Sequence, residues 1–143
     1  MARPDGSASS PERHSATAST AAPTPILDRE VMLASVEEDL GLLRELAELF
    51  FAETPGLLSR LRNGLQARDP ELVERSAHTL KGALSNFGAL SACQAARELE
   101  LRGRESRFEG APELFSALER EVSRASNELS KFLEEVPREG FTR

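Results

Sequence analysis

Apolar residues recur at helical spacing along most of the chain, and no segment alternates with the two-residue period of a strand. The spacing predicts a short helix from about Asp28 and four longer helices over residues 39–67, 69–88, 91–103 and 112–136. This pattern predicts an all-α fold. The short connections favour an up-down-up-down antiparallel four-helix bundle with a short extra N-terminal helix. If the apolar side of each helix faces inward, the core contains Leu43, Leu46, Phe50, Leu61, Leu80, Leu84, Phe87, Leu99, Leu118, Val122 and Leu129.

Three helix starts carry sequence signals. Asp28 and Asp69 are capping residues, and Asp69 is followed by Pro70, which suits the first position of a helix. Ser91 and Gln94 have the spacing of a capping box, so we expect the third of the four longer helices to begin there.

Prolines and glycines predict bends and helix ends. Pro55 either kinks one long helix or opens a new one, and we prefer a single kinked helix. Gly103 is expected to act as a C-terminal cap, and Pro137 should stop the last helix.

Composition divides the chain into three parts. Residues 1–25 are rich in Ser, Thr, Ala and Pro, which predicts a disordered tail or linker, and His14 within it is expected to have no role in chemistry. Residues 26–136 form the predicted bundle, and residues 137–143 a disordered C-terminal tail. A length of 143 residues suits one such domain.

Charge and cysteine content exclude several function classes. The formal net charge of -6 argues against nucleic-acid binding, which needs a basic surface. No apolar run is long enough to span a membrane and no secretory signal is visible, so the expected location is the cytoplasm. Cys93 has no cysteine partner for a disulfide and forms no metal-ligand spacing with histidine, which leaves it as a small core residue.

His78 lies in the middle of the polar face of its helix. At about 100° per residue, Lys81, Gly82 and Ser85 fall on the same face, opposite the apolar stripe. A glycine inside a helix costs about 0.5–1 kcal/mol relative to alanine, so Gly82 suggests close approach of another molecule beside the imidazole. A lysine ammonium next to a nucleophilic nitrogen suits transfer of an anion such as phosphoryl.

The run His78-x-Leu80-Lys81-Gly82, preceded by Ala77 and followed by Phe87-Gly88, resembles the signature of histidine phosphotransfer (Hpt) domains of bacterial two-component phosphorelays. The resemblance covers residues from about 27 to 135 and implies the same four-helix bundle. It also implies a phosphoryl carrier, not an enzyme, because the chain shows no nucleotide-binding signature of its own.

The resemblance assigns roles to four residues. His78 would attack the phospho-aspartate of a receiver domain through Nε2 and pass the phosphoryl group to another receiver. Lys81 would neutralise phosphoryl oxygens, and Gly82 would leave room for the receiver. Ser85 either donates a hydrogen bond to the phosphoryl group or is an ordinary surface residue. The chain needs no cofactor, because the receiver would supply Mg²⁺.

The expected partners are response-regulator receiver domains and a hybrid sensor histidine kinase, with the chain itself a monomer. Leu27, Val31 and Met32 are candidates for the receiver-docking patch. Two alternatives stay open: phosphorylation by the catalytic domain of a hybrid or chemotaxis-type kinase, and a helical adaptor that uses no chemistry. A metal-dependent helical enzyme is the weakest alternative.

Overall fold

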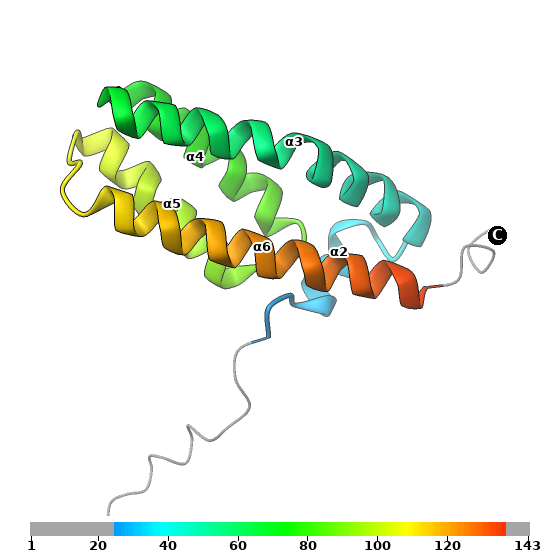
Figure 1. The fold of residues 1–143 in the computed structure, drawn as a ribbon. Coiled ribbons are helices and arrows are strands. Elements are labelled where there is room, and N and C mark those ends of the chain that lie inside the picture. Colours follow the sequence, from blue (N-terminus) through cyan, green and yellow to red (C-terminus); the bar gives the residue numbers. More distant parts are fainter. Residues whose placement is uncertain (1–24, 137–143) are drawn as a thin grey trace, which may run out of the picture.

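The computed structural model describes residues 25–136, which form the helices α2 (Arg29–Ser35), α3 (Leu40–Ala67), α4 (Pro70–Ser85), α5 (Leu90–Glu105) and α6 (Ala111–Glu135). The four long helices run alternately up and down, as predicted (Figure 1). Apart from Pro25, the tails predicted at residues 1–25 and 137–143 lie outside the described residues.

Each long helix packs against the next one in the chain, and α6 closes the bundle against α3. The short helix α2 lies at the end of the bundle where α4 ends. The backbone N–H of Asp28 donates to the carbonyl of Gly88 (3.0 Å), and the Ser35 hydroxyl donates to the carbonyl of Asn86 (3.0 Å). These two bonds fix α2 beside the C-terminal end of the histidine helix.

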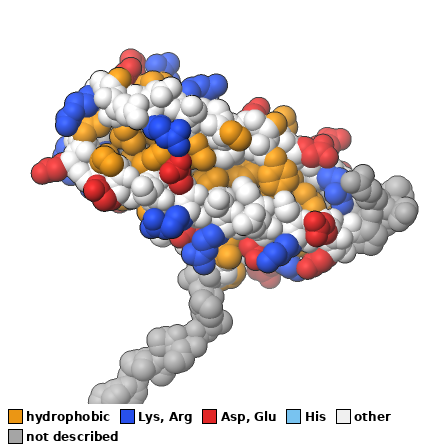
Figure 2. Space-filling model, viewed as in Figure 1, with side chains coloured by type: hydrophobic (Ala, Val, Ile, Leu, Met, Phe, Trp, Pro, Cys, Tyr) orange, Lys and Arg blue, Asp and Glu red, His pale blue; other side chains and the backbone are white. Residues whose placement is uncertain are grey.

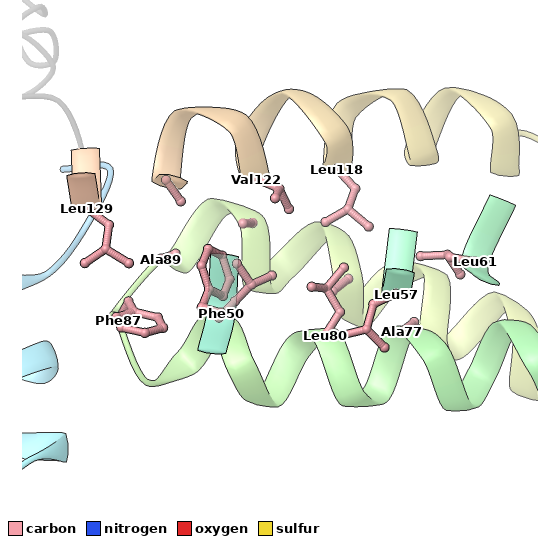
Figure 3. Close-up of a cluster of buried hydrophobic side chains, with 14 of the residues drawn as sticks. Phe50, Leu57, Leu61, Ala77, Leu80, Phe87, Ala89, Leu118, Val122 and Leu129 are labelled. Atoms are coloured by element: carbon pink, nitrogen blue, oxygen red, sulfur yellow. The ribbon is translucent and has the colours of Figure 1, made fainter. Parts of the chain in front are cut away.

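The core fills with side chains from all four long helices (Figure 3). Every predicted core residue is buried except Leu46, which is half-buried and packs against the cluster from its edge. Phe50 of α3 meets Phe87 edge to face, with ring centroids 5.2 Å apart. This contact joins α3 to the segment that follows α4.

The predicted helix starts at Asp28 and Asp69 are confirmed. The Asp28 carboxylate accepts from the backbone N–H groups of Glu30 and Val31, and that of Asp69 accepts from Leu72, satisfying donors that a helix start leaves free. Pro55 lies inside one continuous helix, as preferred.

Both boundaries predicted for α5 are wrong. The residue before α5 is Ala89, which makes no side-chain capping bond, so Ser91 and Gln94 form no capping box. At the other end α5 continues through Gly103 and closes at Ser106, which has a left-handed backbone (φ 55°). Gly103 is buried because α5 crosses α4 there without room for a side chain, and this packing role explains the glycine.

The face formed by α3 and α6 carries hydrophobic side chains in the seam between the two helices (Figure 2). A shallow groove there is lined by Phe51, Thr54, Leu58 and Val122, among others. No helix within residues 25–136 is long and apolar enough to cross a membrane.

Gly88 and Gly110 provide a matched test of how α2 is held. Both have positive φ (65° and 73°), but only at Gly88 would a Cβ lie 2.6 Å from Asp28 Cβ, whereas at Gly110 it would meet Arg102 at 3.7 Å. We expect Gly110→Ala to lower the free energy of unfolding by roughly 1–2 kcal/mol, from backbone strain alone. Gly88→Ala should lose roughly 1–3 kcal/mol more, from overpacking. Equal losses in urea denaturation would contradict this role for Gly88.

Candidate functional site

His78 projects from the middle of α4, with 66% of its side chain exposed. The opposite side of α4 is buried against the core through Val73, Ala77, Leu80 and Leu84. Because this apolar stripe holds the helix in one orientation, the imidazole is held at the surface.

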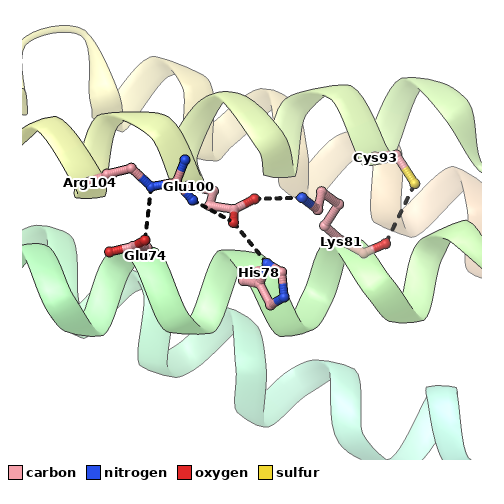
Figure 4. A network of polar contacts seen from close by, with 6 residues as sticks. All are labelled: Glu74, His78, Lys81, Cys93, Glu100 and Arg104. Carbon is pink, nitrogen blue, oxygen red and sulfur yellow. Dashed lines mark hydrogen bonds and ion pairs between the residues drawn. The ribbon is translucent and has the colours of Figure 1, made fainter.

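The ring of His78 contacts a carboxylate from the neighbouring helix. Nδ1 of His78 lies 2.8 Å from Oε2 of Glu100, and the other oxygen of Glu100 lies 2.8 Å from Nζ of Lys81 (Figure 4). Arg104 reaches the same Oε2 at 3.2 Å and also binds Glu74 of α4 at 3.0 Å. A single carboxylate therefore joins the histidine, the lysine and an arginine.

Glu100 can reach His78 because α4 and α5 approach closely. A Cβ added to Gly103 would lie 2.7 Å from the backbone nitrogen of Glu74 and 2.9 Å from the carbonyl oxygen of Pro70. Glu100 lies one turn before Gly103, on the stripe of α5 that is buried against the bundle, and only 6% of its side chain is exposed. The narrow spacing brings this buried carboxylate to the edge of the histidine.

The charges around Glu100 keep it ionised. Burial raises the pKa of the Glu100 carboxyl, but hydrogen bonds from Lys81 and His78 and the positive charge of Lys81 outweigh burial, so its pKa lies below the ordinary value. The pKa of Arg104 is raised, mainly by its bond to Glu74.

An ionised carboxylate only accepts hydrogen bonds, so the contact with Glu100 requires a hydrogen on Nδ1 of His78. In the neutral ring the lone pair is then on Nε2. The arrangement therefore presents Nε2 as a nucleophile on an exposed side chain.

The other three predicted site residues lie close to His78 along α4. Lys81 is partly exposed and bound to Glu100. Gly82 is exposed, and an added Cβ there would meet nothing within 4 Å, so no contact within the described chain explains this glycine. The Ser85 hydroxyl donates to the carbonyl of Gly82 (2.8 Å), a bond within its own helix.

Cys93 is half-buried on α5, and its thiol lies 3.7 Å from the carbonyl oxygen of Lys81. Burial raises the pKa of this thiol, while the charge of Lys81 lowers it by a smaller amount. In the part of the chain that the structure describes, no group of three or more His, Cys, Asp or Glu side chains is placed to hold a metal ion.

Glu100 and Arg104 were not predicted as site residues. The sequence did contain a signal for Glu100, because it is an acidic residue on the buried side of α5. A buried carboxylate needs a cationic partner. Glu74 of α4, on the polar face of the histidine helix, pairs with Arg104. Met32, a candidate for docking, is fully buried and cannot contact a partner, whereas Val31 is exposed.

A family model for the Hpt domain matches residues 45–128, more than half of the chain. The chain belongs to the Hpt domain family. It is thus a helical phosphocarrier domain of phosphorelays. Members of this family interact with receivers and kinases.

Two solved structures resemble this Hpt domain. Histidine-containing phosphotransfer protein B from Pseudomonas aeruginosa PAO1 is 27% identical, with a TM-score of 0.73 over 80% of this chain and 100% of that one. The Hpt domain of a sensor hybrid histidine kinase from Shewanella has the same fold at 17% identity, with a TM-score of 0.67 over 78% of this chain and 96% of that one. No curated protein matches the chain.

The close approach of α5 can be tested at Gly103. Gly103→Ala should lower the free energy of unfolding by roughly 1–3 kcal/mol, because backbone atoms of α4 cannot give way. It should also change the ¹⁵N shifts of the His78 ring, since Glu100 moves away from Nδ1. The matched control is Gly56→Ala, where a Cβ meets nothing within 4 Å; it should raise stability by about 0.5–1 kcal/mol without changing the ring. Unchanged ring shifts in a folded Gly103→Ala variant would count against the role of this contact.

Proposed function

We propose that this chain carries a phosphoryl group on Nε2 of His78 between the receiver domains of a phosphorelay. The observation that carries the proposal is the contact between Nδ1 of His78 and Glu100, which in the neutral ring leaves the lone pair on the exposed Nε2. The Hpt family assignment supports the same role.

The transfer would proceed in line at phosphorus. The Nε2 lone pair forms the N–P bond while the bond from phosphorus to the receiver's aspartate oxygen breaks, and the electron pair leaves with that carboxylate. The receiver would supply Mg²⁺ for the developing charge. No proton has to leave Nε2, so the chain requires no general base of its own.

Lys81 is the proposed cation for the phosphoryl oxygens. Its ammonium is bound to Glu100 at 2.8 Å and is one-third exposed, so a small rotation of the long side chain can bring it to a group on Nε2. Lys81 would then exchange one anionic partner for another. Ser85 would have to release the Gly82 carbonyl before it could donate to the same phosphoryl group.

The proposed docking surface for a receiver extends from the exposed face of α4 at Gly82 toward α2, which is fixed at the end of α4. Val31 on α2 and Leu42 and Leu49 on the first part of α3 are large apolar side chains that are 41–54% exposed. Val31 is on α2, which is fixed to the end of α4, and Leu49 precedes Phe50, which packs on Phe87. Gly82 would allow the partner to approach the backbone next to the ring.

The proposal is tested by incubating the protein with a phosphorylated receiver and measuring acid-labile, base-stable label. We expect label on the wild-type chain and none on His78→Gln, because glutamine has no nucleophilic ring nitrogen to accept the phosphoryl group. His14→Gln is the matched control and should keep full labelling. Label that survives His78→Gln, or that never appears on the wild type, would exclude the proposal.

Gly82→Ala separates docking from chemistry. The variant should raise the free energy of unfolding by about 0.5–1 kcal/mol, because the Cβ meets open space in a helix. Transfer from a receiver should nevertheless slow, since the added methyl lies where the partner approaches. Phosphorylation by phosphoramidate, a small donor that needs no docking, should keep its wild-type rate. Equal slowing with both donors would point to damage of the ring site instead.

A further inference from the structure

The carboxylate of Glu100 touches the ring nitrogen opposite the one proposed to carry phosphoryl. It is nearly inaccessible to solvent, with 6% of its side chain exposed, and its distance to Nδ1 is 2.8 Å. A charge in this position acts on the ring after phosphorylation as well as before it, because the phosphoryl group is added on the exposed side.

Once His78 is phosphorylated, the protonation of Nδ1 determines how readily the N–P bond breaks. A ring with phosphoryl on Nε2 and hydrogen on Nδ1 is formally an imidazolium. When an acceptor oxygen forms its bond to phosphorus, the N–P bond breaks and its electron pair returns to Nε2, so a neutral imidazole leaves. If Nδ1 has lost its proton, the leaving group is an imidazolate, which is much more basic and departs slowly.

We propose that Glu100 keeps the proton on Nδ1 of phosphorylated His78 and thereby holds the phosphoryl group in its readily transferred form. This inference rests on the proposed function, because it assumes that His78 is the phosphorylated residue. It makes Glu100 a positioning residue that acts on the lifetime of the phosphorylated carrier through the ring.

Some neighbouring charges stabilise the proton on Nδ1 and others destabilise it. Lys81 of α4 and Arg104 of α5 are cations that oppose it, while Glu100 of α5 favours it directly and Glu74 of α4 favours it through Arg104. Within residues 25–136, α3 makes no hydrogen bond or ion pair with His78. If Lys81 moves to the phosphoryl oxygens, Glu100 loses one cationic partner and its attraction for the Nδ1 proton increases.

Glutamine at position 100 separates charge from hydrogen bonding. The amide oxygen of Glu100→Gln can still accept from Nδ1–H, so the ring keeps its orientation, but the negative charge is gone. The protein is loaded with phosphoramidate, which needs no receiver, and the phosphohistidine signal is followed by ³¹P NMR between pH 5 and 9. We expect the titration midpoint of the ring to fall by about one pH unit in this variant. At pH values above both midpoints, transfer to a receiver should slow by up to about tenfold.

Two further variants complete the test. Arg104→Gln removes an exposed cation from Glu100 and should move the midpoint upward, which checks the proposal without a change in the buried side chain. Glu71→Gln, two turns from His78 on the exposed side of α4, should leave the midpoint unchanged. Identical midpoints in the wild type, Glu100→Gln and Arg104→Gln would overturn the proposal. Failure to label from a receiver, with normal loading by phosphoramidate, would instead count against the proposed function.

Discussion

The contact between α4 and α5 at Gly103 determines what the surface of α4 can do. Backbone atoms of Glu74 and Pro70 lie where a Cβ of residue 103 would be, so the two helices approach more closely than side chains would allow. At that distance Glu100, on the buried stripe of α5, reaches across to His78 and Lys81. A wider spacing would leave an exposed histidine without a defined tautomer and a lysine without a partner.

Four glycines inside the helices fall into two groups with different physical causes. At Gly103 a Cβ would clash with the backbone of α4, and at Gly64 it would be in tight contact with Val73, so packing within the fold accounts for both. Gly56 and Gly82 meet no atom within 4 Å and still carry the helix penalty of about 0.5–1 kcal/mol relative to alanine. Nothing in the described chain offsets that penalty at Gly82, and its place beside His78 makes contact with a partner the simplest reason for it.

A structural feature could be predicted from the sequence where it depends on residues close together in the chain. Asp28 and Asp69 act on the backbone two or three residues away, so their capping roles were predicted correctly. Gly103 was interpreted as a helix end. A glycine that is required because another helix packs closely against it cannot be distinguished in the sequence from a glycine that ends its own helix. The pairing of Glu100 with His78, which are 22 residues apart, depends on the register of two helices, and no local pattern contains it.

Burial of the Glu100 charge needs a reason beyond stability. Buried ion pairs recover their desolvation penalty only with good geometry, and apolar residues in their place are often as stable or more so. Here the carboxylate has three partners, and one of them is the exposed ring. An apolar residue at position 100 would leave Nδ1 of His78, Lys81 and Arg104 without their shared carboxylate partner. The proposed role of His78 as a phosphoryl carrier therefore explains this cluster better than the stability of the bundle does.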